Sequence, residues 1–130
     1  MKRLILIAGA LLASTLLSQP GTAQSASEYQ AADAQLNAAY RTAMARMKQL
    51  DRGTKPADLP PAERAGPSYS QALLNSQRAW LAYRDANCRA FSYEYRGGSA
   101  QGLSNRVCLT RVTRARTAEL RLLQSVFAPK

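Results

Sequence analysis

The sequence has 130 residues but no histidine and only two cysteines. Without histidine the chain lacks the commonest general base and the commonest ligand of transition metals, so catalytic triads built on an imidazole are excluded. The cysteines, at positions 88 and 108, do not have the Cys-x-x-Cys spacing of thiol redox enzymes. The eight acidic residues are scattered and show no metal-ligand spacing. We therefore predict no catalytic residues, no metal site and no cofactor, and we expect that the chain is not an enzyme.

Strict alternation of apolar and polar residues, which marks a half-buried strand, is also absent from the sequence. Apolar residues instead recur at steps of three and four, which predicts amphipathic helices over residues 27–50, 68–95 and 100–127. Paired glycines at 97 and 98 favour a chain reversal between the last two helices. The predicted fold is all-α, with three main helices in an antiparallel bundle. The predicted inward-facing positions are Tyr29, Leu36, Tyr40, Ala43, Met44, Met47, Leu50, Tyr69, Leu73, Gln77, Trp80, Arg84, Cys88, Phe91, Tyr95, Val107, Cys108, Val112, Ala115, Leu120, Leu122, Leu123 and Phe127.

Proline is nearly confined to residues 51–67, which hold four of the six prolines in the chain. Because proline cannot continue a helix, this stretch is predicted to be a surface loop, with a short helical turn near residues 62–65. The loop is long for a connection between two helices, so it is either mobile or a contact surface. Mobility is the first interpretation.

A long apolar run occurs only at the N-terminus, where "MKR" precedes "LILIAGALLASTLL". Small residues follow at Gly21 and Ala23, so the sequence predicts a signal peptide over residues 1–23 that is cleaved after Ala23. The mature domain would cover residues 24–130 and contain no transmembrane segment. A retained membrane anchor is the alternative, although the run is short for a bilayer span. A cleaved signal peptide implies a periplasmic or secreted protein.

Acidic residues are few, 8 against 18 basic residues, and the formal net charge is +10. Loss of Lys2 and Arg3 with the signal peptide would lower this charge to +8. An exported chain seldom meets nucleic acid, so the candidate partners are anionic wall polymers, anionic lipid headgroups or an acidic protein. A solvated basic surface without a partner is the other interpretation. Among the arginines of residues 100–127, Arg116 is the candidate for an inward position.

Two cysteines in an exported chain predict a disulfide. If the last two helices fold back about Gly98, Cys88 and Cys108 each lie ten residues from the turn and meet at the same height. Facing helices have axes about 8–10 Å apart, and inward-pointing cysteines can then reach the Cα separation of roughly 5.5–6 Å that a disulfide needs. Two buried free thiols are the alternative.

Trp80, Arg84 and Cys88 are four residues apart and therefore share one helical face. We predict that Trp80 fills the core and that Arg84 lies against the indole, where its guanidinium needs a carboxylate. Asp33 falls in the apolar stripe of the first predicted helix and is the first candidate partner, and Glu119 is the second. If the pair is buried, loss of Asp33 would destabilise the fold by a few kcal/mol.

Four stretches, in the order "ADAQLNAAYR" (32–41), "SQRAWLAYRDANC" (76–88), "GGS" (97–99) and "CLTRVTRARTAEL" (108–120), resemble the N-terminal domain family named for the lysozyme inhibitor LprI. The resemblance covers nearly all of the predicted mature chain. It implies an all-helical, disulfide-linked periplasmic or secreted domain that binds lysozyme and protects the cell wall. Many members have a further cysteine near the start of the first helix, which this chain lacks. The matching positions, most of which look like scaffold, are Asp33, Leu36, Asn37, Tyr40, Gln77, Trp80, Arg84, Asp85, Cys88, Cys108, Arg116 and Leu120.

The charge of the chain bears on this expectation, because animal lysozymes are typically basic. Two basic proteins repel each other at long range unless acidic groups are focused at the contact. The prediction is an exported helical binding module that resembles LprI-like lysozyme inhibitors. The alternatives are a basic periplasmic protein that binds anionic envelope components, not lysozyme, and a periplasmic protein whose partner is another protein.

Overall fold

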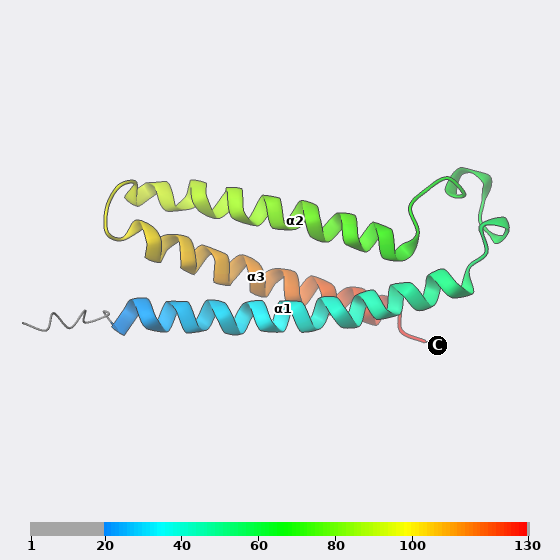
Figure 1. Cartoon of the computed structure of the whole chain (residues 1–130), viewed down its shortest axis with the longest axis horizontal. Helices are drawn as coiled ribbons and strands as arrows, with labels where there is room; N and C mark the ends of the chain where they lie inside the picture. The colour runs from blue at the N-terminus through cyan, green and yellow to red at the C-terminus, as the bar shows by residue number, and fades with distance from the viewer. Residues whose placement is uncertain (1–19, 130) are drawn as a thin grey trace, which may run out of the picture.

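The structure is a computed structural model that describes residues 20–129. Three long helices, α1 (Pro20–Gly53), α2 (Tyr69–Ser92) and α3 (Gln101–Val126), alternate in direction along the chain, so α1 and α3 are parallel and α2 runs back against both (Figure 1). No strand occurs within residues 20–129. The all-α fold with three main helices is therefore confirmed.

Short 3₁₀ turns fill the connections. The turns η1 (Pro56–Asp58) and η2 (Pro61–Glu63) lie in the proline-rich loop, and η3 (Tyr93–Tyr95) continues directly from α2. The predicted helical turn at residues 62–65 thus forms slightly earlier, at residues 61–63, because Pro61 occupies its first position. The end of the second predicted helix, residues 93–95, narrows to 3₁₀ geometry before the double glycine, where Gly97 takes a φ of 77°.

The first helix is longer than predicted. It starts at Pro20 and ends at Gly53, whereas the apolar spacing predicted residues 27–50. The residues between 20 and 27 contain no apolar stripe, so periodicity could not detect a helix there. The predicted signal peptide lies mostly in residues 1–19, which are outside the described residues. None of the helices within residues 20–129 combines the length with the apolar run that crossing a membrane requires.

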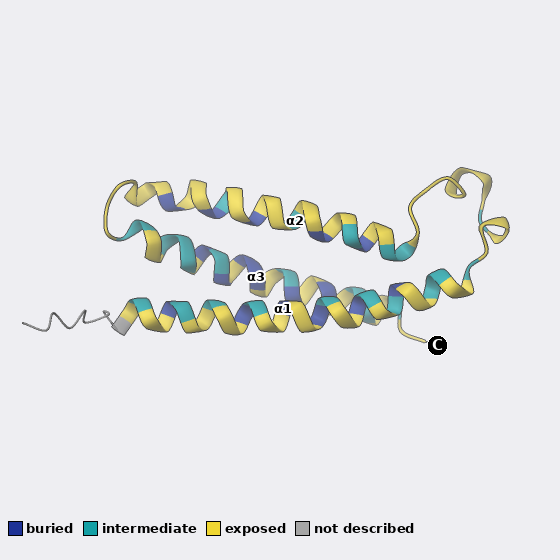
Figure 2. Cartoon of the chain, viewed as in Figure 1, coloured by how far each residue is buried: buried dark blue, intermediate teal, exposed yellow. Residues whose placement is uncertain are grey.

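Two apolar clusters form the core. The larger one lies toward the loop end and joins all three helices, and the smaller one surrounds the two cysteines. Trp80 is partly buried and packs against both clusters, so it links them. Figure 2 shows the buried residues as stripes on the facing sides of the helices. The larger cluster contains Leu36, Ala39, Ala43, Met47, Leu73 and Leu120, and the smaller one contains Cys88, Cys108 and Val112.

Five predicted inward positions are wrong: Phe91, Tyr95, Val107, Ala115 and Leu122 are exposed, Leu122 to 65%. Helix α3 packs against α1 on one side and α2 on the other, so its buried face is broader and differently centred than one apolar stripe suggests.

Four hydroxyl residues of α2 and α3 that are not among the predicted inward positions are buried. Thr110, Thr113 and Thr117 of α3 are buried, as is Ser92 of α2. The hydroxyls of Thr110 and Thr117 donate to the carbonyls of Arg106 and Thr113 one turn earlier, both at 3.0 Å. Such a local bond lets a threonine enter a core without a partner on another helix.

The disulfide between Cys88 and Cys108 links α2 to α3, with a Cα–Cα distance of 5.4 Å. Both cysteines are buried, and the bond lies on the side where the two helices face each other. The predicted pairing and the hairpin about the double glycine are confirmed.

Asp51, near the end of α1, fixes the start of α2. Its carboxylate accepts hydrogen bonds from the backbone N–H groups of Tyr69 (2.7 Å) and Ser70 (3.2 Å) and from the Ser68 hydroxyl (3.2 Å). Desolvation raises the pKa of Asp51, but the hydrogen bonds from Ser70, Tyr69 and Ser68 outweigh it, so the pKa lies below its ordinary value of 3.8. The loop is therefore closed at its base by a charged cap on a helix N-terminus.

Removal of the disulfide tests how much it contributes. Replacement of both Cys88 and Cys108 by Ser should lower the free energy of unfolding by about 3 kcal/mol, because the unfolded chain is no longer restrained. The melting temperature should then fall by roughly 10 °C or more. A reducing agent should destabilise the natural chain and leave the double variant unchanged, and equal melting temperatures of both proteins without reductant would contradict the expectation.

Replacement of Asp51 by Ala should lower the free energy of unfolding by about 0.5–2 kcal/mol, the usual loss for a helix cap. The folded-state pKa of Asp51 is lowered, so the carboxylate stabilises the fold above its ordinary pKa of 3.8 and loses this effect as the pH falls through the folded-state value. Urea titrations at neutral pH and near pH 3 should show the gap between natural chain and variant shrinking in acid. A gap that is constant with pH would show that the charge is not involved.

Candidate functional site

A cluster of stacked charged and aromatic side chains lies in the middle of the bundle. The Trp80 indole has the Arg84 guanidinium carbon 5.2 Å from its ring centroid and the Arg116 guanidinium carbon at 6.0 Å. The cluster thus combines a tryptophan from α2 with arginines from α2 and α3, and Asp33 of α1 lies at its edge. The structure brings together all four residues that the sequence assigned to a polar core.

The carboxylate partners differ in part from the prediction. The Arg84 Nε and Nη2 atoms each lie 2.8 Å from Oδ1 of the neighbouring Asp85, while Asp33 is at 3.9 Å from Nη1. The Asp33 side chain is 40% exposed and the Asp85 side chain is 61% exposed, so neither pair is buried. Helical phase does not predict the contact with Asp85, because adjacent residues lie on different faces of a helix, although their long side chains can still meet.

Glu119 is not a partner of Arg84, as the second prediction held, but of Arg116, at 2.9 Å. Arg116 also donates from Nη2 to the Ser76 hydroxyl at 2.8 Å and from Nε to the Gln77 side-chain oxygen at 3.2 Å. Gln77 is buried, so its side-chain oxygen needs a hydrogen-bond donor inside the bundle. The guanidinium therefore fastens α3 to α2 with two hydrogen bonds, and its third bond, to Glu119, stays within α3.

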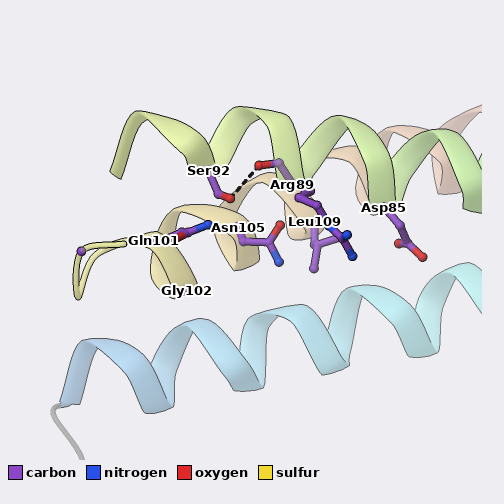
Figure 3. Close-up of a pocket in the computed structure, with 8 residues that line it drawn as sticks. Asp85, Arg89, Ser92, Gln101, Gly102, Asn105 and Leu109 are labelled. Atoms are coloured by element: carbon purple, nitrogen blue, oxygen red, sulfur yellow. Dashed lines mark hydrogen bonds between the residues drawn. The ribbon is translucent and has the colours of Figure 1, made fainter. Parts of the chain in front are cut away.

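A polar groove of about 610 Å³ opens at the double-glycine end (Figure 3). It lies in the part of the bundle where α1 and α2 diverge, as Figure 1 shows. The Ser92 hydroxyl donates to the Arg89 carbonyl at 2.7 Å, and the Gln101 side-chain oxygen accepts from the Gly97 N–H at 2.9 Å, so part of the lining is already engaged. The lining residues are Asp85, Arg89, Ser92, Gly98, Gln101, Gly102, Asn105 and Leu109.

The proline-rich loop forms a second candidate site at the opposite end. A cavity of about 510 Å³ lies between the loop and the start of α2, with Asp51, Leu59 and Tyr69 in its wall. Arg64 donates from Nε to the Leu59 carbonyl at 3.0 Å and from Nη2 to the Ala57 carbonyl at 3.4 Å, which closes the loop on itself. The sequence favours a mobile loop over a contact surface at these residues, and it does not predict the hydrogen bonds of Arg64.

No group of three metal-ligating side chains occurs within residues 20–129. The described part of the chain is thus a small helical bundle with a disulfide hairpin, a polar cluster, a polar groove at one end and a cavity under the loop at the other. These features place the protein in the class of small disulfide-linked helical modules whose candidate binding sites lie on the surface.

Comparison with known proteins identifies the family. The family model described as "Lysozyme inhibitor LprI" matches residues 17–120, so the chain belongs to the LprI lysozyme inhibitor family. The match includes both cysteines, the polar cluster and the proline-rich loop. The resemblance read from the sequence is confirmed.

A curated relative, "Uncharacterized protein R02472" of Rhizobium meliloti (strain 1021), is 41% identical over 96 residues. The aligned region covers 74% of this chain and 66% of the relative, slightly less than two thirds of its length. No solved structure matches the chain.

The polar cluster can be tested by substitution. Because both carboxylates around Arg84 are in contact with water, Asp33→Ala and Asp85→Ala should each lower the free energy of unfolding by less than about 1 kcal/mol. Trp80→Ala should lower it by about 3 kcal/mol, since the indole packs on both core clusters. Urea denaturation measures all three, with the exposed Arg78→Ala on the same helix as control. A loss of several kcal/mol on removal of the Asp33 carboxylate would instead support the buried ion pair of Asp33 and Arg84 that the sequence predicts.

Proposed function

We propose that this chain is an exported binding protein that inhibits lysozyme and so protects the cell wall. Membership of the LprI lysozyme inhibitor family carries the proposal, because the matched residues 17–120 include α1, α2 and most of α3. The protein acts by covering the enzyme, not by a reaction of its own. This role needs a folded surface and no catalytic group.

Export is the second part of the proposal. The basic start, the apolar run and the small residues before Gln24 fit a signal peptide over residues 1–23, and the mature domain is then residues 24–130. Cleavage after Ala23 would remove the first turn of α1 and leave Ser25, whose hydroxyl accepts a bond from Arg106 Nε at 3.2 Å. A buried disulfide suits the oxidising periplasm or the exterior, where lysozyme is met.

The net charge of +10 supports one competing function, the binding of anionic envelope polymers. The two functions respond differently to salt. Wall binding driven by net charge fades steeply as ionic strength rises, whereas a contact that buries shape-matched surface keeps most of its affinity.

A muramidase assay with the oxidised chain of residues 24–130 tests the proposal. Lysozyme activity on peptidoglycan should fall with increasing protein and reach near-complete inhibition at micromolar excess. Inhibition should persist between about 0.05 and 0.5 M salt. The reduced and heat-unfolded chain, which has the same charge, is the control.

Full lysozyme activity at micromolar excess would contradict the proposal. If the chain then sediments with peptidoglycan at low salt and is released at high salt, the function is the binding of anionic envelope components.

A further inference from the structure

The proline-rich loop projects from the bundle. Residues 54–67 extend beyond the ends of α1 and α2 at the end of the bundle opposite the double glycine (Figure 1). The side chains of residues 55–58 and 60–67 are all exposed, and only Thr54 and Leu59 are half-buried (Figure 2). The loop therefore presents mostly exposed side chains on a projection.

The backbone of this projection is held in place although its side chains are exposed. Four turn hydrogen bonds fix it, from Asp58 to Lys55 (2.9 Å), Leu59 to Pro56 (3.2 Å), Glu63 to Pro60 (2.9 Å) and Gly66 to Glu63 (3.1 Å). The Arg64 guanidinium binds two further carbonyls, and Asp51 secures the base. The prolines restrict φ as well. Little conformational entropy remains to be lost when a partner orders this loop.

The charge of the loop differs from that of the chain. Residues 54–67 carry Lys55, Asp58, Glu63 and Arg64 and are formally neutral, within a chain of net charge +10. A basic lysozyme is therefore repelled less by this loop than by the chain as a whole. The Lys55 ammonium forms no ion pair within residues 20–129, whereas the Arg64 guanidinium is occupied by carbonyls. Lys55 is thus the free cation of the projection.

The active site of lysozyme has the complementary form. It is a cleft in which two carboxyl groups flank the glycosidic bond of the substrate. A cleft is filled by a segment that projects into it. The groove of about 610 Å³ at the double-glycine end is itself concave, so it cannot enter the lysozyme cleft. A rigid projection with a free ammonium group matches both the shape and the charge of the cleft.

We propose that residues 54–67 enter the substrate cleft of lysozyme and that Lys55 faces the catalytic carboxylates. This inference rests on the proposed inhibitor function and assigns that function to a defined segment. The rest of the bundle then acts as the support that holds the loop in its bound shape.

Two substitutions of equal charge change test the segment. Lys55→Glu should raise the inhibition constant by about tenfold or more, because it places a like charge against the carboxylates. Arg111→Glu, on the exposed face of α3, alters the net charge equally and should leave the inhibition constant within about twofold. A third variant replaces residues 55–66 by a Gly-Ser linker of equal length and should lose inhibition while keeping its helical circular dichroism.

A short chitin oligosaccharide that occupies the cleft provides an independent readout. It should compete with the chain for lysozyme in a binding titration, and the competition should be absent for the linker variant, which no longer binds. If the Lys55→Glu variant and the linker variant both inhibit lysozyme as well as the natural chain does, only the assignment to the loop is overturned. The same follows if the oligosaccharide does not reduce binding of the natural chain. A natural chain that neither binds nor inhibits lysozyme overturns the proposed function together with it.

Discussion

The attachment of α2 to α3 is the constraint on which the rest of the structure depends. Helix α2 approaches α1 toward the loop end, and the Arg84–Asp33 pair at 3.9 Å also joins these two helices, but α2 diverges from α1 toward the double glycine, where α3 lies beside it. Three features provide this attachment in succession: the bonds of Arg116 to Ser76 and Gln77, the packing of Trp80, and the disulfide between Cys88 and Cys108. Without them α2 would have an apolar core only along its first half.

The polar cluster explains how a strongly basic chain places arginines inside a small bundle. A guanidinium is weakly hydrated and flat, so it can lie on an indole face while its N–H groups reach outward. Arg84 directs them toward two exposed carboxylates, and Arg116 directs them toward Ser76, Gln77 and Glu119. The charges thus remain close to water at their outer ends, and burial is limited to the stems and the faces of the side chains.

The sequence determined the three helices, the hairpin and the disulfide because each depends on local spacing or on symmetry about Gly98. Helical phase likewise places Trp80 and Arg84 on one face, which is why the sequence indicated that these two side chains lie together. It could not predict which carboxylate binds which arginine, because that depends on side-chain reach between helices. It also missed the buried threonines of α3, of which Thr110 and Thr117 bond to carbonyls one turn earlier and so pack like small apolar residues.

The sequence predicts the position of the proline-rich loop, but how its backbone is held escaped prediction for a different reason. Its stability comes from contacts with residues outside the loop and from one arginine turned back on its own backbone, and neither has a periodic signature. The same end of the bundle is closed by the Tyr69 ring against Phe127, 6.1 Å apart, and by the bond from Arg46 to the Phe127 carbonyl at 2.6 Å. All three helices therefore meet beneath the loop, whereas at the double-glycine end α1 and α2 diverge and each is joined to α3. A protein that presents a preformed loop to a partner needs its most rigid packing under that loop, and this is where the bundle has its larger core cluster.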